Sequence, residues 1–210
     1  MIAIIDYGVS NLLSIKRAVE LFDKSVVITH DEKIVANADK IILPGVGAFE
    51  HGMRKIKECG MLEVLKKEAF EGKPILGICL GMQMLFESSE EGGFIEGLGL
   101  ISGTVKKIPN TDVDGEKHSV PHIGWEKLVK NPEIRENILL SDVDLQREVY
   151  FVHSYEAHVS NSQNLVASAS YGGRMICAIA QRDNVVGCQF HPEKSGQVGL
   201  QILENFIKKF

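Results

Sequence analysis

The chain has 210 residues, 44% hydrophobic and 24% charged, which are the proportions of a globular protein large enough to bury a full core. Its formal net charge is −5, so the sequence offers no basic face for nucleic acid. No segment approaches the roughly 20 apolar residues of a membrane span. The four cysteines contain no C-x-x-C pair and are too sparse for a disulfide framework. We expect one domain over residues 1–210, in the cytoplasm, with no nucleic-acid or membrane partner.

The first half of the chain alternates short apolar runs with helical patterns. Leu12, Ile15, Val19 and Phe22 share the spacing of one helix face. Strands are expected over residues 2–5, 25–29, 40–43 and 75–78, and a helical region over residues 51–70 with a break at Gly60. Fully apolar strands in this alternation are typical of a parallel sheet covered by helices on both faces.

The second half is richer in strands, and some of them are expected to pair antiparallel at the sheet edge. The candidates are residues 100–108, 123–129, 148–153, 165–170, 175–181 and 185–190. A final helix is expected to begin near Ser195 as its N-cap. The predicted fold is therefore α/β and three-layered, with a mostly parallel sheet, helices on both faces and antiparallel edge strands.

The segment Gly77-Ile78-Cys79-Leu80-Gly81 has the G-x-nucleophile-x-G form that α/β hydrolases place at a strand-to-helix turn, with Cys in place of Ser. The nucleophile of such a turn adopts a strained backbone, and glycines two positions away avoid a collision. The helix N-terminus favours the thiolate form of Cys79, and the Leu80 N–H would point into the site as an oxyanion donor. The alternative is a small buried cysteine between packing glycines.

A second candidate part is Pro44-Gly45-Val46-Gly47, a glycine-rich turn after a predicted strand. Such a turn opens at the carboxyl edge of the sheet, where these folds bind ligands. Its glycines allow a backbone N–H to face a developing negative oxygen. An ordinary strand-to-helix turn is the alternative. A dinucleotide-binding loop is excluded because Glu50 stands at the sixth position of that motif, where glycine is needed.

The third part is Gln189-Phe190-His191-Pro192-Glu193, at the end of an apolar run. A cysteine nucleophile needs a base, and the base needs an orienting group. His191 would lie at the same sheet edge as Cys79, and Glu193 can reach the far nitrogen of the imidazole. The order Cys, His, Glu therefore predicts a catalytic triad. A lone histidine at a strand end is more often structural, and the pairing with Glu193 changes that balance.

The other histidines show no metal-binding pattern. His118 and His122 are four residues apart, but Pro121 between them spoils a helical metal pair. His153 and His158 have no nearby cysteine or acidic cluster of metal-ligand form. We expect no metal and no other cofactor.

With these parts assembled, the sequence resembles the class I glutamine amidotransferases along essentially its whole length. Within that class it is similar to the glutaminase subunits of imidazole glycerol phosphate synthases. The matching motifs are Asp6-Tyr7-Gly8 with Asn11, Leu12 and Ser14, followed by residues 44–49, 77–83, 121–125, 150–155 and 191–195. The resemblance implies a flavodoxin-like α/β fold and a single amidotransferase domain.

The resemblance also implies a reaction. Cys79 would attack the side-chain amide carbon of glutamine, and His191, held by Glu193, would take the thiol proton and give it to departing ammonia. A glutamyl thioester would form and water would release glutamate. The N–H groups of Leu80 and of Val46 or Gly47 would stabilise the oxyanion. The matching positions that contact substrate glutamine are Gln83, Ser154 and Tyr155.

A partner is implied as well. Ammonia would pass, without entering bulk water, to a (β/α)₈-barrel cyclase subunit that forms a heterodimer with this chain and makes imidazole glycerol phosphate for histidine synthesis. The positions expected on the partner-facing surface are Tyr7, Asn11, Trp125 and Lys194. We expect weak activity alone and strong activation by the partner, because the glycines of residues 44–47 allow a peptide flip that completes the oxyanion hole.

Two departures from the usual motifs bear on the partner. Ser10 stands where glycine is usual, and Glu126 where asparagine is usual. Some relatives supply ammonia for surface-sugar synthesis, which is the nearest alternative.

A cysteine peptidase or another cysteine hydrolase on the same scaffold would explain the elbow and His191, but not Gln83. A non-catalytic binding module is disfavoured by the intact Cys79, His191 and Glu193.

Overall fold

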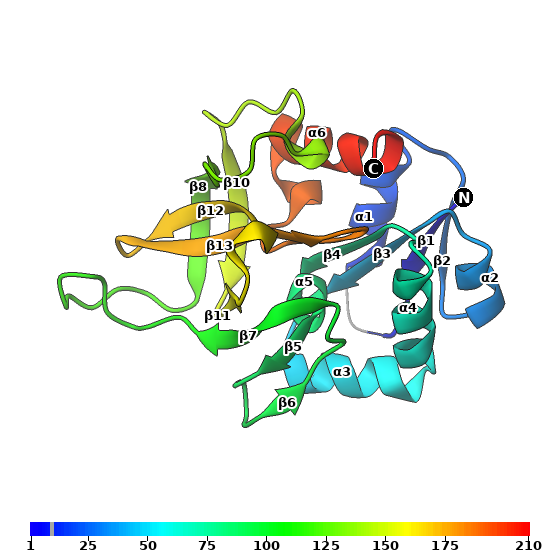
Figure 1. The fold of residues 1–210 in the computed structure, drawn as a ribbon, viewed down its shortest axis with the longest axis horizontal. Coiled ribbons are helices and arrows are strands. Elements are labelled where there is room, and N and C mark those ends of the chain that lie inside the picture. The colour runs from blue at the N-terminus through cyan, green and yellow to red at the C-terminus, as the bar shows by residue number, and fades with distance from the viewer. Residues whose placement is uncertain (9–10) are drawn as a thin grey trace.

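The computed structural model describes residues 1–8 and 11–210, and its largest element is an eight-stranded sheet in the order β2-β1-β3-β4-β14-β13-β12-β9 (Figure 1). The parallel strands are β1 (Ile2–Ile5), β2 (Val26–Thr29), β3 (Lys40–Gly45), β4 (Ile75–Cys79) and β14 (Val185–Cys188). Three antiparallel strands complete one edge: β13 (Arg174–Arg182), β12 (Leu165–Tyr171) and β9 (Val129–Lys130). The predicted parallel sheet with antiparallel edge strands is confirmed.

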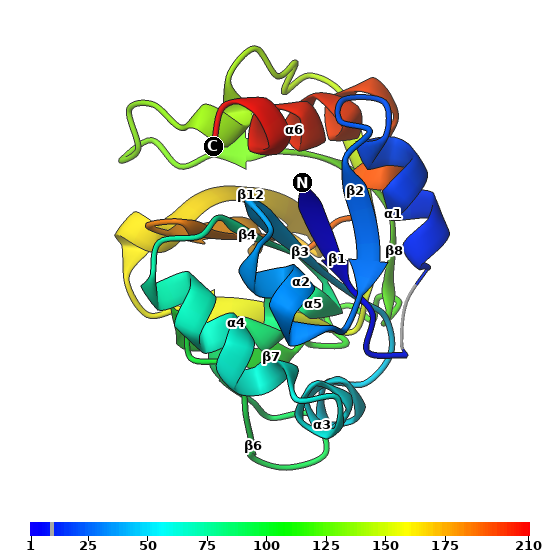
Figure 2. The ribbon, with the colours of Figure 1, turned by 90° about the vertical axis from the view of Figure 1, so that its right-hand side faces the viewer.

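Helices cover both faces of this sheet, as Figure 2 shows most clearly. One face carries α1 (Leu12–Val19) and α6 (Gly196–Lys208), and the other carries α2 (Glu32–Ala36), α3 (Phe49–Glu58), α4 (Met61–Phe70) and α5 (Leu80–Met84). Successive side chains of a strand point to opposite faces. Accordingly Ile2 and Ile4 pack in the core under α1 and α6, while Ala3 and Ile5 pack in the core under the other helices.

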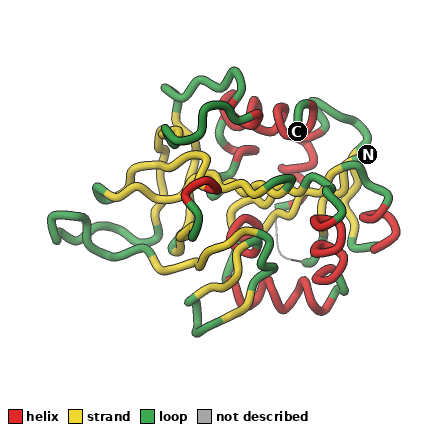
Figure 3. Tube along the Cα trace, in the orientation of Figure 1, coloured by secondary structure: helices red, strands yellow, loops and turns green. Residues whose placement is uncertain are grey.

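Two smaller sheets flank the central one (Figure 3). One pairs β8 (His122–Lys127) antiparallel with β10 (Glu148–His153). The other has the order β11-β7-β5-β6, formed by β11 (Tyr155–Val159), β7 (Ile101–Lys107), β5 (Phe86–Ser89) and β6 (Ile95–Glu96). Three short 3₁₀ turns complete the elements: η1 (Ile138–Leu140), η2 (Ser162–Asn164) and η3 (Pro192–Lys194). Strands β5, β6 and β11 and helix α2 are additions to the predicted elements.

Gly60 separates α3 from α4, as predicted, because its φ of +75° lies in the left-handed region that glycine adopts readily. Ser195 does precede α6, but it makes no side-chain cap. Its hydroxyl instead donates to the carbonyl oxygen of His191 at 2.6 Å. No helix in the described part of the chain is long and apolar enough to cross a bilayer.

Candidate active site

Three neighbouring strands bring the predicted catalytic residues to one edge of the sheet. Strands β3, β4 and β14 lie side by side and parallel, so their carboxyl ends meet. Cys79 is the last residue of β4, the loop with Val46 and Gly47 follows β3, and His191 follows β14. Residues distant in sequence therefore converge because of strand order alone.

The turn from β4 into α5 has the geometry expected of a nucleophile elbow. Cys79 has φ +54° and ψ −110°, a backbone conformation that residues with a side chain rarely adopt. A Cβ atom on Gly77 would lie 2.8 Å from the backbone of Gly81, and one on Gly81 would overlap the carbonyl oxygen of Leu43. The two glycines therefore let α5 sit directly against the sheet with Cys79 held at its tip.

His191 is fixed from two sides. Its backbone N–H donates to the Tyr150 carbonyl oxygen at 3.0 Å, and the Ser195 hydroxyl donates to its own carbonyl oxygen at 2.6 Å while accepting from the Tyr150 N–H at 2.9 Å. Its Nδ1 lies 2.8 Å from Oε1 of Glu193. Because a carboxylate accepts, Nδ1 carries the hydrogen, and Nε2 is the ring nitrogen left to act as base.

The charge environment of His191 favours its protonated form. Burial of the ring lowers its pKa, but the interactions with Cys79 and with the buried carboxylate of Glu193 outweigh burial and raise that pKa to about 9. Nε2 is buried and has no hydrogen-bond partner among the described residues. This nitrogen can therefore take and hold a proton from the sulfur.

A cavity of about 440 Å³ opens over Cys79. Its lining includes residues predicted as nucleophile, base, oxyanion hole and substrate contacts, namely Cys79, His191, Val46, Gly47, Leu80, Gln83, Ser154 and Tyr155. Glu193 lies behind His191 and supports the ring from outside the cavity. The volume suits a ligand the size of an amino acid.

Gln83 forms part of the wall of this cavity. It is buried, and its Nε2 donates to the carbonyl oxygen of Tyr155 at 2.9 Å and to Oε1 of Gln189 at 3.0 Å. Tyr155 therefore lines the cavity and also holds the Gln83 amide through its carbonyl oxygen. Both hydrogens of the Gln83 amide are used inside the protein.

Sequence reasoning missed other residues that line the cavity: Glu91, Pro121, Val152 and His153. Glu91 Oε2 accepts from the Phe49 N–H at 2.8 Å, so it links the start of α3, which follows the loop with Val46 and Gly47, to the cavity rim. His153 Nδ1 donates to the Tyr155 carbonyl oxygen at 2.9 Å, and His153 Nε2 lies 3.2 Å from Nδ1 of His122. Pro121, Val152 and His153 lie within the matching motifs of residues 121–125 and 150–155, whereas Glu91 lies outside every motif and carried no signal.

The residues predicted to face a partner divide into exposed and buried positions. Asn11 and Lys194 are exposed, and Trp125 is 49% exposed beside the ring of Tyr150. Tyr7 is different: it is buried, and its hydroxyl donates to the Pro44 carbonyl oxygen at 2.6 Å. The hydroxyl of Tyr7 therefore holds the start of the loop over residues 44–47, and a contact of Tyr7 with a partner stays a prediction.

Of the two unusual motif positions, Ser10 lies outside the described residues. Glu126 is on the face of β8 opposite Trp125, since side chains alternate along a strand. Its Oε1 lies 3.8 Å from the buried Nε2 of His122. Burial and the neighbouring Glu148 raise the pKa of the Glu126 carboxyl. The substitution therefore affects the inner side of this small sheet and leaves the side with Trp125 unchanged.

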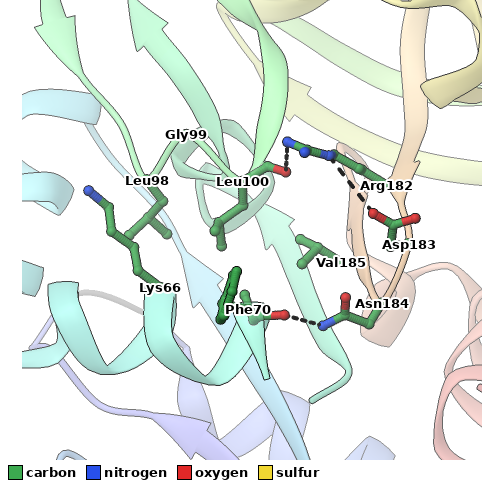
Figure 4. A pocket seen from close by; sticks show the side chains of 10 residues that line it. Lys66, Phe70, Leu98, Gly99, Leu100, Arg182, Asp183, Asn184 and Val185 are labelled. Carbon is green, nitrogen blue, oxygen red and sulfur yellow. Dashed lines mark hydrogen bonds and ion pairs between the residues drawn. The ribbon is translucent and has the colours of Figure 1, made fainter. Parts of the chain in front are cut away.

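A second cavity, of about 450 Å³, lies at the opposite, amino-terminal edge of the sheet (Figure 4). Phe70, Leu98 and Leu100 form an apolar wall, and Arg182 and Asn184 close it through bonds to backbone carbonyl groups. Its lining contains neither a cysteine nor a histidine. This cavity therefore lacks the kind of nucleophile and base that line the cavity over Cys79.

Comparisons with known proteins find relatives that match nearly the whole chain. A protein from Legionella pneumophila (strain Lens), "Imidazole glycerol phosphate synthase subunit HisH 1", is 47% identical over 209 residues, which cover 99% of this chain and 98% of that protein. A protein from Geobacillus sp. (strain WCH70), "Imidazole glycerol phosphate synthase subunit HisH", is 45% identical over 98% of this chain and 95% of its own length.

Solved structures share the fold. One titled "Crystal structure of glutamine amidotransferase" has a TM-score of 0.69 at 15% identity, covering 97% of this chain and 98% of its own. The structure of PurLQS from Thermotoga maritima has a TM-score of 0.67 at 20% identity, covering 98% and 96%. The sequence model of the family "Glutamine amidotransferase class-I" matches residues 3–210. With an elbow cysteine, a paired histidine and this match along the whole chain, the protein belongs to the class-I glutamine amidotransferase family.

Proposed function

We propose that this chain is the glutaminase subunit of an imidazole glycerol phosphate synthase, and that it hydrolyses glutamine with Cys79, His191 and Glu193 as its triad. The observation that carries the proposal is the meeting of Cys79 and His191 in one cavity, with Glu193 2.8 Å behind the imidazole. Relatives with 45–47% identity along nearly the whole chain carry the name of that subunit. Residues 1–210 act as one amidotransferase domain.

In the first step, the Cys79 sulfur attacks the side-chain amide carbon of glutamine. His191 Nε2 holds the thiol proton and delivers it to the departing nitrogen, so that ammonia leaves and a glutamyl thioester remains. Water, deprotonated by the same nitrogen, then attacks the thioester and releases glutamate. Glu193 keeps the hydrogen on Nδ1 throughout, which leaves Nε2 on the side of the reacting atoms.

The oxyanion hole uses backbone N–H groups at the cavity wall. Leu80 follows Cys79 at the start of α5, and Val46 and Gly47 lie across the same cavity. Gly47 has φ +99°, so this peptide has the freedom to reorient that only glycine readily gives. Loss of one such donor typically lowers kcat by about 10²–10³-fold. Gln83, Ser154 and Tyr155 line the part of the cavity that would hold the rest of glutamine.

The ammonia is used by a cyclase subunit, a (β/α)₈ barrel that forms a heterodimer with this chain. The docking face is the side of β8 and β10 that carries Trp125 and Ile123, both exposed, with Lys194 and Asn11 nearby. Elements η3 and α1 are in contact, and η3 also touches β10, which supports one connected docking surface for these positions. The Cys79 cavity opens beside it, since Val152 of β10 lines that cavity.

The reaction takes place in the cytoplasm. All four cysteines, including the nucleophile, are free thiols in the structure, which suits a reducing compartment. The surface-sugar alternative was based on Ser10 and Glu126. Glu126 points away from the face with Trp125, so it gives that alternative no support.

The decisive experiment is glutamine hydrolysis by wild type and Cys79→Ala, each assayed with the cyclase subunit and its ribonucleotide ligand. Ammonia release should fall by about 10³-fold or more in Cys79→Ala, because no other group of the triad can form the thioester. Added ammonium should still support the cyclase reaction of the complex. Near-normal glutaminase turnover by Cys79→Ala, or peptide hydrolysis in place of glutamine hydrolysis by wild type, would refute the proposal.

A further inference from the structure

Gln189 connects the catalytic cysteine to a buried amide network. It follows β14 directly, two residues before His191, and its side chain is fully buried. Its Nε2 lies 3.8 Å from the Cys79 sulfur, and its Oε1 accepts from Gln83 Nε2 at 3.0 Å. Gln83 Nε2 also donates to the Tyr155 carbonyl at 2.9 Å. The sulfur, two carboxamides and a backbone carbonyl therefore form one chain of contacts.

The orientation of each amide in this chain is determined by the backbone. A carbonyl oxygen can only accept, so the group of Gln83 that faces Tyr155 must be its NH₂. The second hydrogen of that NH₂ then points at Gln189, which must present its oxygen in return. The NH₂ group of Gln189 is thereby left facing the Cys79 sulfur. No exchange of O and N in either amide preserves all of these bonds.

The surroundings of the sulfur differ for its neutral and charged forms. As a thiol it can donate weakly to the Val152 carbonyl, 3.9 Å away. As a thiolate it can only accept, and the Gln189 NH₂ is a donor placed within reach. Hydrogen bonds to an ionised group are stronger than those between neutral groups, and they favour the ionised form. A buried donor at this point therefore stabilises the thiolate, which is the nucleophilic form of Cys79.

From this geometry we propose that Gln189 is a further catalytic residue, whose side-chain NH₂ donates to the Cys79 thiolate, and that Gln83 is the positioning residue that aims it. The inference rests on the proposed function, since it assumes that Cys79 is the nucleophile. It adds a second group, besides His191, that stabilises the charged sulfur before attack and again when the thioester is broken.

The test is the pH dependence of Cys79 alkylation by iodoacetamide, in the complex with the cyclase subunit. Mass spectrometry of the peptide with Cys79 separates it from the other free thiols, Cys59, Cys177 and Cys188. Gln189→Met fills the same space without a donor, and its alkylation midpoint should rise by about one pH unit. Gln189→Glu keeps the shape and the bond from Gln83, but puts an oxygen beside the sulfur, and should raise the midpoint at least as far.

A matched control separates catalysis from structure. Asn205, in α6, is another fully buried amide. Its Nδ2 donates to the carbonyl oxygens of Leu139, in η1, and of Ser141, which follows η1. Asn205→Leu should lower thermal stability without moving the midpoint. Midpoints within about 0.3 pH units of wild type in both Gln189 variants would overturn the inference. If Gln189→Met does not fold, the Gln189→Glu midpoint decides.

The same preparations distinguish this inference from the proposed function. Hydrolysis of glutamine by Cys79→Ala would refute the proposed function, and the inference with it. Loss of hydrolysis in Cys79→Ala, together with unchanged midpoints in the Gln189 variants, would refute only the role of Gln189. In the expected case the kcat of Gln189→Met also falls by about tenfold. A rise of about one pH unit in the midpoint of Cys79 lowers the fraction of thiolate by the same factor.

Discussion

His191 combines two features that oppose each other. Its ring is buried, which disfavours a charge, yet contacts with Cys79 and Glu193 raise its pKa to about 9. The protonated ring is therefore more stable in the folded chain than in the unfolded one, where its pKa is near 6.5. This contribution to stability is complete below pH 6.5 and is lost as the pH rises through about 9.

Glu193→Gln should therefore destabilise the protein most at low pH. The variant removes the buried charge that holds protonated His191, so its loss of unfolding free energy relative to wild type should be larger at about pH 6 than at about pH 10. Some loss should remain at high pH, because neutral His191 still donates from Nδ1. Denaturant titrations at the two pH values measure both differences. Equal losses at both pH values would contradict the assignment.

The elbow between β4 and α5 keeps Cys79 in an unfavourable backbone conformation. A φ of +54° with ψ of −110° costs a residue with a Cβ atom energy that glycine does not incur. The surrounding contacts of α5 with β3, β4 and β14 hold the turn in place. The strain is thus a property of the element and is independent of the thiol chemistry.

Cys79→Gly should accordingly be more stable than Cys79→Ala, although both lack the thiol. Relief of the strain should give Cys79→Gly an advantage of about 1–3 kcal/mol in unfolding free energy. Gly60→Ala is the control of opposite sign. It puts a Cβ atom at a left-handed position that glycine already occupies, so its free energy of unfolding should be lower than that of wild type. Thermal melts compare the variants. If Cys79→Ala proves the more stable of the two, the elbow carries no strain.

Much of this arrangement could be predicted from the sequence, because apolar runs mark buried strands and the order of strands places their ends. Glu148–His153 was predicted to the residue, and the catalytic candidates Cys79 and His191 followed from strand ends. Strands β5 and β6 were missed because they are short and are formed by pairing with distant segments. The burial of Tyr7 could not be predicted, because only the folded chain shows that its hydroxyl reaches Pro44.

Contacts between side chains were the least predictable part of the site. Gln189 stands beside His191 in sequence, but its partners Gln83 and Cys79 are 106 and 110 residues away. Nothing in its local pattern distinguishes it from any polar residue at a strand end. Its role depends on the Tyr155 carbonyl that orients Gln83, and a backbone group of that kind leaves no trace in a sequence.

At the scale of the whole molecule, the outer side of the β8–β10 sheet is the surface most suited to a partner. Ile123 is 60% and Trp125 49% exposed on the same side of β8. Exposed aromatic residues that can be fully desolvated are typical centres of protein interfaces. The cavity with Cys79 opens next to this side, through Val152. A partner docked there would lie beside the opening of this cavity.

Trp125→Ala should weaken binding of the cyclase subunit by about 2 kcal/mol, or roughly 30-fold in Kd, as expected for the loss of a central aromatic contact. The melting temperature of the isolated chain should change little, because about half of the residue's surface is already exposed to water. Val129→Ala, at a site 50% exposed on β9, is the matched control and should leave Kd unchanged. Isothermal titration calorimetry measures both. An unaltered Kd for Trp125→Ala would place the partner elsewhere.

The glycine that follows the nucleophile by two positions has a further consequence, for how such a protein can decay. Position 81 has no room for any side chain, because the Leu43 carbonyl oxygen occupies the space. Loss of the thiol at position 79 adds no atom and therefore creates no clash. A descendant released from selection for ammonia production would therefore lose Cys79 early and retain Gly81 for as long as it still folds. Homologues that have lost the activity should therefore keep Gly81 more often than Cys79.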